Sequence, residues 1–510
     1  MSERSWRADV RCAPVPVTEV DSWVGWVLTA LALVVVVLEI GLRIVALGVI
    51  PGNRKPSTGM AWLLLILLVP IIGFAVFLLF GRTALERRRH ERQQQANTAI
   101  RARTSALVAP DAVLDHPPYL RSVVDLNRRL GSLPLSVGNH VELLPDYAAS
   151  IRAMTDAVDS AQVHVDVEFY ITALDHMTEP LFVALEAAAS RGVTVRLLFD
   201  HLGSRGIPGY AGLVRRLEDG PIQWHPMLPI HLMRGPVRRP DLRNHRKLMV
   251  IDGVVGFTGS QNLTEPGYNK PKNHALGREW VELMVRLHGP VVTSLEAVFA
   301  SDWLVETGEL LEVAPHVAGR APEAAIHDVP CQVVPSGPGY VAENNLRLFT
   351  TLIYSATRRI SLTSPYFVPD ESLLYAVTTA AQRGVDVELF VSELADQFMV
   401  GHAQASYYRA LLEAGVKIWL YPAPYVLHSK HFSLDDDVAV IGSSNMDLRS
   451  FALNYEISLM LIDREVVQRL RAVEDGYRNL STELTLAQWL TRPARTRYVD
   501  NVMRLTAALQ

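Results

Sequence analysis

The stretch His428–Glu456, HSKHFSLDDDVAVIGSSNMDLRSFALNYE, decides the fold of this chain because its pattern occurs twice. It begins with H-x-K-x4-D-x6-G-S-x-N, which in this copy runs from His428 to Asn445. The same pattern, with the same spacing, runs from His245 to Asn262. A single short motif of this kind arises by chance, whereas two copies that share the extension indicate an internal repeat. The sequence therefore predicts two related halves.

Around both copies the chain alternates between predicted strands and predicted helices. In the first half Val163–Tyr170 and Val193–Phe199 have the apolar patterning of strands, and an Arg-Gly pair ends the helix between them. The second half repeats this order with Ile360–Phe367 and Val385–Val391. Strands separated by helices favour parallel pairing with helices on both faces. We therefore expect an α/β fold with two repeats, whose mostly parallel sheets pack as a pseudo-two-fold pair.

The predicted domains follow from this repeat. Residues 110–315 are assigned to the first repeat and residues 335–510 to the second. Between them, Glu312–Gly339 is rich in Pro and Ala and lacks a regular period, as expected of a linker. Residues 1–100 are assigned to a separate N-terminal membrane region.

Two apolar segments in that region predict transmembrane helices at about residues 23–45 and 60–80, because about 20 apolar residues cross a hydrocarbon core. The first segment contains Glu39 and Arg43, which are four residues apart and can pair on one helical face. The alternatives are a cleaved signal peptide for the first segment and a buried core helix for the second. The second segment follows closely and ends in an arginine cluster, which disfavours cleavage of the first.

Basic residues predict the orientation of these helices. The loop between the segments offers Arg54 and Lys55. The basic positions after the second segment are Arg82, Arg87, Arg88, Arg89 and Arg92. The positive-inside rule therefore places both termini and both repeats in the cytoplasm, with the chain crossing the cell membrane twice.

The composition disfavours several other classes of protein. The net charge of -4 gives no general affinity for nucleic acid. The chain has two cysteines, Cys12 and Cys331, and neither lies in a pattern of metal ligands. It contains neither a P-loop nor a dinucleotide-binding motif. We therefore expect no nucleic-acid partner, no metal and no cofactor.

The repeated residue types suit the chemistry of a phosphodiester. His245 and His428 can act as nucleophile and general acid, so that one difficult displacement at phosphorus becomes two easier steps. Lys247 and Lys430 supply fixed positive charge, and hydroxyl and amide side chains can donate hydrogen bonds to the phosphoryl oxygens. These donors are Ser260, Asn262, Ser443 and Asn445. Because attack and protonation occur on opposite sides of phosphorus, the two halves must meet with their motifs facing each other.

Glutamates are expected to support the histidines. A histidine nucleophile needs an acceptor at its other ring nitrogen, which fixes the tautomer. Glu456 is the candidate for His428, and Glu282 is favoured over Glu279 for His245. Each glutamate is thus predicted to serve the histidine of its own half.

The paired motifs resemble those of the phospholipase D superfamily, over roughly residues 140–470. Bacterial cardiolipin synthases are more similar still, because they share the two N-terminal spans and several further stretches. These stretches are Arg54, Ala61-Trp62, Ser364–Asp370, Gly442–Phe451 and Leu453–Glu456. The resemblance implies transfer of a phosphatidyl group between two phosphatidylglycerol molecules of the bilayer. The products are then cardiolipin and glycerol, formed through a phosphohistidine intermediate.

The resemblance also assigns roles to the motif residues. It implies a catalytic set made of His245, Lys247, Asp252, His428, Lys430 and Asp435. It further implies that His245 is the nucleophile and His428 the general acid. From the residues alone, Asp252 and Asp435 are expected to stabilise their motifs locally and not to contact phosphate.

Two other functions fit the same motifs. A membrane-anchored phospholipase D-type phosphodiesterase would be a hydrolase that uses water in the second step, and the sequence does not show how well the intermediate is shielded. A non-catalytic membrane scaffold would not need both motifs. The lipid donor, the acyl preference and the oligomeric state are not specified by the sequence.

Overall fold

The computed structural model describes residues 20–52, 56–81, 87–104, 117–229, 241–313, 319, 321–340 and 343–505. The chain forms two compact units, Met1–Arg82 and Thr83–Gln510. Three of the basic residues that predict the membrane orientation, Arg54, Lys55 and Arg82, lie outside the described residues. Part of the predicted linker between the halves lies outside them as well.

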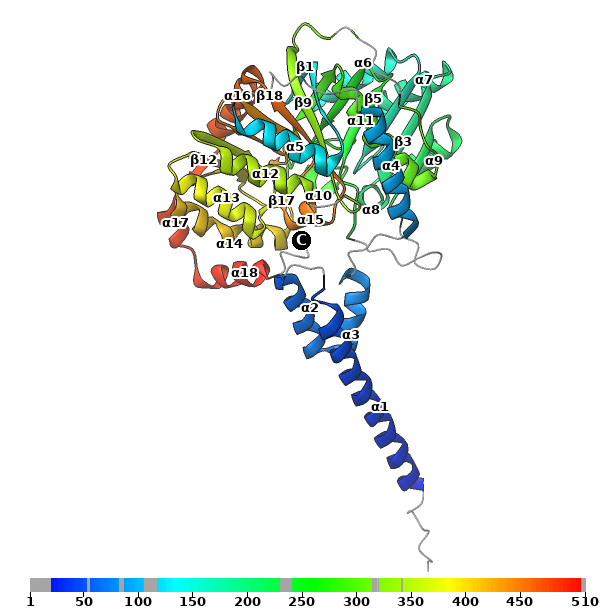
Figure 1. The fold of residues 1–510 in the computed structure, drawn as a ribbon, viewed down its shortest axis with the longest axis vertical. Coiled ribbons are helices and arrows are strands. Elements are labelled where there is room, and N and C mark those ends of the chain that lie inside the picture. Colours follow the sequence, from blue (N-terminus) through cyan, green and yellow to red (C-terminus); the bar gives the residue numbers. More distant parts are fainter. Residues whose placement is uncertain are drawn as a thin grey trace, which may run out of the picture. The chain divides into compact units, whose positions relative to one another are not determined.

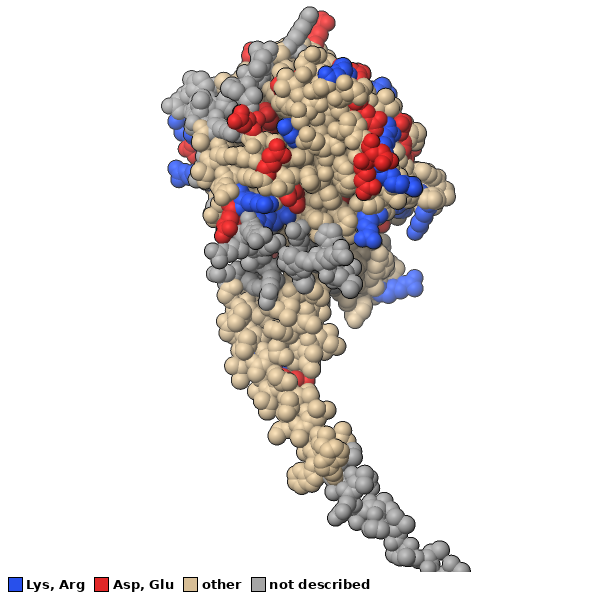
Figure 2. All heavy atoms as spheres, turned by 90° about the vertical axis from the view of Figure 1, so that its right-hand side faces the viewer, with Lys and Arg blue, Asp and Glu red and all other residues tan. Residues whose placement is uncertain are grey.

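The N-terminal unit begins with the helix α1 (Val20–Val49), whose residues Gly25–Val49 are long and apolar enough to cross a membrane. At 1.5 Å per residue this stretch is about 37 Å long, which exceeds a hydrocarbon core of about 30 Å. Its surface is almost free of charge (Figure 2), and Arg43 lies 3.5 Å from Glu39, as their spacing predicted. Among the described residues, α1 is the one helix that meets this length and composition.

The second predicted span, residues 60–80, is not one continuous helix. It is divided among three short elements, α2 (Pro56–Leu68), α3 (Pro70–Val76) and the π-helix η1 (Phe77–Gly81). Pro70 cannot continue the helix before it because proline lacks the N–H that would bond to the preceding turn. The ring centroids of Trp62 and Phe77 are 5.4 Å apart, whereas a straight helix would separate these residues by about 22 Å. The segment therefore folds back as a helical hairpin.

The C-terminal unit is built around one sheet of 15 strands (Figure 1). In spatial order these are β19 (Thr482–Leu484), β13 (Lys417–Tyr421), β12 (Asp386–Ser392), β10 (Arg359–Thr363), β15 (His431–Leu434), β16 (Val438–Gly442), β18 (Glu456–Ile462), β9 (Ile326–Ser336), β1 (Leu135–Leu144), β8 (Met284–His288), β6 (Val255–Gly259), β5 (Lys247–Ile251), β2 (His164–Phe169), β3 (Thr194–Asp200) and β4 (Gln223–Met227). The strands of the two halves thus form one sheet, and β9 and β1 lie at the junction.

The strand pairing corrects the predicted mostly parallel arrangement. Within this sheet, parallel pairs are confined to β2–β3–β4 and to β10–β12–β13. The motif strands form the antiparallel hairpins β5–β6 and β15–β16 and pair antiparallel with their other neighbours. The strand–helix alternation predicted the parallel pairs. It failed for the motif strands because tight turns, and not helices, connect them. The sheet is therefore mixed.

Helices surround this sheet and complete the core. They are α4 (Arg87–Thr104), α5 (Tyr119–Gly131), α6 (Tyr147–Asp159), α7 (Glu179–Ser190), α8 (His201–Arg205), α9 (Tyr210–Asp219), α10 (Pro271–Ala275), α11 (Val291–Thr307), α12 (Asn344–Ser355), α13 (Glu371–Gln382), α14 (Phe398–Ala414), α15 (Leu448–Ala452), α16 (Arg464–Leu480), α17 (Leu486–Leu490) and α18 (Ala494–Arg504). In Figure 1, α6, α7 and α9 accompany the first half, and α12, α13 and α14 accompany the second.

One core cluster joins the two halves. It includes Leu287 and Phe299 from the first half and Ile441 and Leu459 from the second, all of them fully buried. The helix α11 is buried along nearly its whole length. The helix α4, which the sequence assigned to the membrane region, packs on α11 in this unit. The halves therefore share a sheet and a core.

Candidate functional site

Both motif histidines line one cavity of about 310 Å³. Residues of both halves bound this cavity, and the motif asparagines Asn262 and Asn445 line it as well. His245 lies shortly before β5, and His428 lies between the short strand β14 (Val426–Leu427) and β15. The two motifs therefore face each other, as the chemistry of the repeated residues required.

Each motif is hydrogen-bonded to the backbone of the other half. The His245 N–H donates to the Tyr455 carbonyl at 2.9 Å, and the His428 N–H donates to the Val281 carbonyl at 2.8 Å. The strand β14 pairs in parallel with β7 (Trp280–Val281), and Asn244 forms the corresponding bridge with Tyr455. The residue after each acceptor carbonyl is a glutamate. This pairing therefore brings the glutamate of one half to the histidine of the other.

The glutamates contact the histidines in crossed pairs. Oε2 of Glu456 lies 3.1 Å from Nδ1 of His245, and Oε1 of Glu282 lies 2.6 Å from Nδ1 of His428. The prediction that each glutamate serves its own half is wrong, because the backbone pairing crosses between the halves. Of the two first-half candidates, Glu282 and not Glu279 makes the contact.

The motif serines hold these glutamates. Oγ of Ser443 donates to Oε2 of Glu456 at 2.5 Å, and Oγ of Ser260 donates to Oε2 of Glu282 at 2.6 Å. Each serine oxygen also accepts the backbone N–H that follows its glutamate. Both hydroxyl protons are thus used within the protein. The serines position the glutamates in this structure, whereas the sequence had them donating to phosphoryl oxygens.

The two asparagines that line the cavity are held differently. Oδ1 of Asn262 accepts the Ile171 N–H at 3.1 Å, and its Nδ2 donates to the Tyr268 hydroxyl oxygen at 2.8 Å. Oδ1 of Asn445 is buried without a hydrogen-bond partner among the described residues. A side-chain amide in such a cavity can donate to a phosphoryl oxygen.

Two buried lysines lie next to the histidines. Nζ of Lys247 donates to the His245 carbonyl, and Nζ of Lys430 donates to the His428 carbonyl, both at 2.6 Å. Burial lowers the pKa of Lys247 to about 7, and repulsion from Lys430 adds to this effect. Burial also lowers the pKa of Lys430 to about 8. An anion bound between the two ammonium groups would stabilise both charged forms.

The histidines are neutral and their glutamates are charged near pH 7. Burial lowers the pKa of His245 and of His428 to about 4, against the opposing effect of the adjacent carboxylates. Burial opposes ionisation of Glu456 and Glu282, but the adjacent histidines and lysines hold the pKa of each carboxyl below its usual value. A neutral imidazole that donates through Nδ1 carries its lone pair on Nε2. Both Nε2 atoms can therefore act as nucleophile or base.

The motif aspartates do not line the cavity. Asp252 accepts the backbone N–H groups of residues 162–164 at 2.7–2.8 Å. Asp435 accepts those of residues 357–359 in the same way, at 2.7–3.0 Å. Each aspartate ties the end of its motif hairpin to the start of the neighbouring strand, β2 or β10. This geometry fits the local stabilising role expected from the residues alone.

Several cavity side chains lie outside the repeated pattern. The ring centroid of Tyr170 lies 4.8 Å from that of His245, and the ring centroid of Tyr366 lies 6.4 Å from that of His428. Further lining residues that the sequence did not single out are Arg243, Tyr268, Trp280, Asp396 and Arg449. Nearness in the sequence to a motif or to its glutamate could have pointed to all of these residues except Asp396. Arg243, for example, precedes its motif histidine by two residues.

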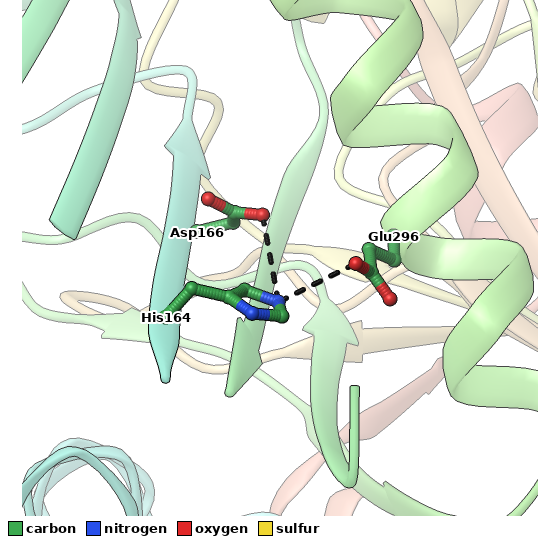
Figure 3. Close-up of side chains that lie close together, drawn as sticks. All are labelled: His164, Asp166 and Glu296. Atoms are coloured by element: carbon green, nitrogen blue, oxygen red, sulfur yellow. Dashed lines mark ion pairs between the residues drawn. The ribbon is translucent and has the colours of Figure 1, made fainter. Parts of the chain in front are cut away.

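A separate cluster of ionisable side chains lies at the start of β2, outside the cavity. Nε2 of His164 lies 3.4 Å from Oε1 of Glu296 and 3.9 Å from Oδ2 of Asp166 (Figure 3). These side chains are of types that bind metal ions. However, Arg196 donates to Oδ1 of Asp166 at 3.0 Å and neutralises that carboxylate. The cluster is therefore best explained as an ion-pair network that ties β2 to β3 and α11.

Comparison with known proteins covers most of the chain. A family profile described as "Cardiolipin synthase, PLD-like domain" matches residues 154–303 and 349–474, and one described as "Phospholipase_D-nuclease N-terminal" matches residues 27–82. "Cardiolipin synthase A" of Proteus mirabilis (strain HI4320) is 34% identical over 453 residues, which cover 88% of this chain and 92% of the relative. The protein of the same name from Klebsiella pneumoniae (strain 342) is 34% identical over 464 residues, which cover 90% of this chain and 94% of the relative.

A solved structure supports the fold alone. The phosphatidylserine synthase of Haemophilus influenzae Rd KW20 aligns with a TM-score of 0.57 over 76% of this chain and 99% of that chain. The sequence identity in this alignment is 14%. The likeness therefore concerns the arrangement of the strands and helices, and not the substrate.

Proposed function

Because this chain belongs to the cardiolipin synthase family, with its phospholipase D-like catalytic domain, we propose that it transfers a phosphatidyl group between two phosphatidylglycerol molecules. The products are cardiolipin and glycerol, and the protein is a phospholipid phosphatidyltransferase. One observation carries this proposal above all. His245 and His428 share one cavity, and a buried glutamate of the opposite half contacts Nδ1 of each.

The first step forms a phosphohistidine. Nε2 of one histidine attacks the phosphorus of phosphatidylglycerol, so that an N–P bond forms and the bond from phosphorus to the glycerol oxygen breaks. The second histidine takes up a proton from solvent when the anionic substrate binds, gives this proton to the oxygen, and glycerol leaves. The phosphate brings negative charge into the cavity, which raises the pKa of the histidine that donates the proton. By the family resemblance, His245 attacks and His428 protonates.

In the second step a P–O bond forms and the N–P bond breaks. The terminal hydroxyl of another phosphatidylglycerol gives its proton to His428, its oxygen attacks phosphorus, and the N–P bond breaks. Both histidines then return to their starting states, and one phosphodiester has replaced another. The exchange needs no nucleotide, because the bond made is of the same kind as the bond broken. Lys247, Lys430 and Asn445 stabilise the charge on the phosphoryl oxygens in both steps.

The remaining motif residues act by positioning. Ser260 and Ser443 hold the glutamates that orient the histidines, and Asn262 is fixed by its own hydrogen bonds. Asp252 and Asp435 fix the motif hairpins. None of these contacts requires a cofactor or a metal.

The substrates are membrane phospholipids, and the chain is anchored where they lie. The helix α1 is long and apolar enough to span the cell membrane. The arginines that follow residue 81 support a cytoplasmic location for the catalytic unit. We also propose that this unit consists of two repeats, residues 110–315 and 335–510.

The proposed function is tested with the purified full-length protein in liposomes. The substrate is phosphatidylglycerol that carries the label in its headgroup glycerol. No metal or nucleotide is added. We expect cardiolipin and labelled glycerol in equal amounts, and neither product from the His245→Ala/His428→Ala variant. Phosphatidic acid in place of cardiolipin would make the protein a hydrolase. A folded protein that forms no product would support the non-catalytic scaffold.

A further inference from the structure

The cavity is asymmetric, although repeated halves form it. The position two residues before the motif histidine is Arg243 in the first half and Val426 in the second. The position four residues after the motif asparagine is Arg449 in the second half and Pro266 in the first. Both arginines line the cavity. The two basic side chains are therefore departures from the repeat, and not parts of the motif that both halves need.

The two arginines lie on the same side of the cavity. The Tyr455 N–H donates to the Arg243 carbonyl at 2.9 Å, and the Asn454 N–H donates to the Arg449 carbonyl at 2.9 Å. The Arg449 guanidinium in turn donates to the carbonyl of Asp241 at 3.2 Å. We call the side formed by Arg243, Arg449 and Asn454 the arginine wall. All three of its side chains line the cavity.

Arg449 supplies the charge of this wall that no ion pair holds, although the buried carboxyl of Asp447, which also lines the cavity, interacts with it electrostatically. Arg243 pairs with the buried carboxylate of Asp200 at 3.2 Å. Arg449 has no carboxylate within ion-pair distance among the described residues, and its Nε is buried without a hydrogen-bond partner. A half-buried guanidinium with unused donors is suited to an anion, and the paired oxygens of a phosphate match its geometry best.

At the equivalent position in the other half the cavity lining is aromatic, although the exposed Lys270 of that half also lines the cavity. Asn454 lies two residues before Glu456, and the residue at that place in the first half is Trp280. The ring of Trp280 packs on that of Tyr268, with centroids 4.7 Å apart, in a cluster that includes Val426. One side of the cavity therefore suits an anion, whereas the other presents aromatic and aliphatic side chains.

The transfer reaction places two phosphates in this small space. One is the phosphate that reacts between the histidines, and the other belongs to the phosphatidylglycerol that accepts the phosphatidyl group. A cavity of about 310 Å³ holds headgroups but not acyl chains. Building on the proposed function, we propose that Arg449, assisted by Arg243, binds the phosphate of the acceptor lipid. This subsite favours an anionic lipid alcohol over water or a neutral alcohol.

The test compares two acceptors in the same tube. Full-length protein in liposomes is given phosphatidylglycerol and labelled free glycerol. Cardiolipin formation measures transfer to an acceptor that carries phosphate, and label in phosphatidylglycerol measures transfer to a neutral acceptor. In the Arg449→Gln variant the ratio of the first rate to the second is expected to fall about tenfold or more, because a charge-assisted contact to one acceptor is lost. In Arg449→Lys the ratio should fall less, because lysine keeps the positive charge.

The control is Arg286→Gln, which neutralises a half-buried arginine on β8 that does not line the cavity. Its ratio should equal that of the unmodified protein. Equal losses of both rates in Arg449→Gln would overturn the subsite, since the arginine would then serve the reacting phosphate or the fold. An unchanged ratio would overturn it as well. Unmodified protein that exchanges glycerol but makes no cardiolipin would instead refute the proposed function on which the subsite rests.

Discussion

The two reactive histidines depend on glutamates from opposite halves, and this crossing is testable at single residues. In a His428→Ala background the phosphohistidine on His245 should accumulate from a donor with a good leaving group. Adding Glu456→Gln should slow its formation about a hundredfold, because Nδ1 of His245 loses its charged acceptor. Adding Glu282→Gln should have little effect, because its histidine partner is already absent. Rapid-quench measurement of labelled protein gives both rates.

If Glu282→Gln slowed the formation of the intermediate and Glu456→Gln did not, each histidine would be paired with the glutamate of its own half, as the sequence suggested. A separate control addresses the nucleophile itself. If the His245→Ala variant, and not the His428→Ala variant, formed the labelled intermediate, the roles of the two histidines would be exchanged. The crossed glutamate contacts would then be tested in that background.

The two lysines predict how activity depends on pH. The pKa of Lys247 is about 7 and that of Lys430 about 8 in the free protein. A lysine is charged below its pKa, so the attraction for phosphate is lost as the pH rises from about 7 to about 9. Because the general acid His428 has a pKa of about 4 in the free protein, kcat/KM for phosphatidylglycerol already falls with pH below this range, and we expect the fall to become steeper from about pH 7 to about pH 9. The fall in kcat should begin at higher pH, because bound phosphate raises the pKa of both lysines.

The measurement is a set of initial rates from about pH 6 to about pH 10. Lys417→Met, which removes an exposed lysine paired with Asp386, should leave the profile unchanged. A fall in kcat/KM that becomes no steeper up to about pH 9 would show that the buried lysines keep their charge in the free protein.

At the residue scale, the sequence predicted the site residues that occur in both copies of the motif. His245 and His428 were recognisable because each occurs at a fixed spacing in two copies. The glutamate pairing was not, because spacing along the chain does not reveal which half supplies the neighbouring backbone. Arg243 and Arg449 were missed for the opposite reason, since each occurs once and has an uncharged counterpart.

At the scale of elements, the sequence predicted the helix α1 but not the hairpin that follows it. The apolar stretch at residues 60–80 has the length of one span. Hydropathy does not register that Pro70 ends a helix or that Gly73 permits a close contact. A Cβ at Gly73 would lie 2.8 Å from the Leu65 carbonyl oxygen, so the absence of a side chain allows the arms to meet. Each arm is shorter than a hydrocarbon core.

The hairpin predicts a topology with one full span. Residues on either side of it should lie on the same face of the membrane, and the N-terminus should lie on the other. We expect Gly52→Cys and Gln95→Cys, each in a Cys12→Ser background, to react with an impermeant maleimide from the same side. The natural Cys12 of the unmodified chain should react from the opposite side. Cys331 is buried and should stay unlabelled in every case.

Intact and permeabilised cells distinguish the two sides in this measurement. Two full spans, as the hydropathy suggests, would give a different pattern. Gly52→Cys would then label from the side opposite to Gln95→Cys, and Cys12 would label together with Gln95→Cys.

At the scale of the whole molecule, the repeat predicted two bodies, whereas the strands form one sheet. The strand β9 pairs with β18 of the second half and with β1 of the first. The cluster that contains Leu287 and Leu459 crosses the same junction. The periodicity within each half could not predict this joining, because pairing between distant strands leaves no local pattern. The crossed histidine–glutamate pairs need the joined arrangement.

The shared sheet predicts that the two halves unfold together. Phe182→Ala on α7 removes a fully buried ring far from the second half and should cost about 3–5 kcal/mol. If the unit is cooperative, hydrogen exchange at the β12 amides of the second half should accelerate as much as exchange at β3. Phe349→Ala on α12 is the matched change in the other half and should accelerate exchange at β3 equally. Acceleration confined to the mutated half in both variants would show that residues 110–315 and 335–510 fold independently. The contacts between each histidine and the glutamate of the other half would then form only after the two domains have folded and docked.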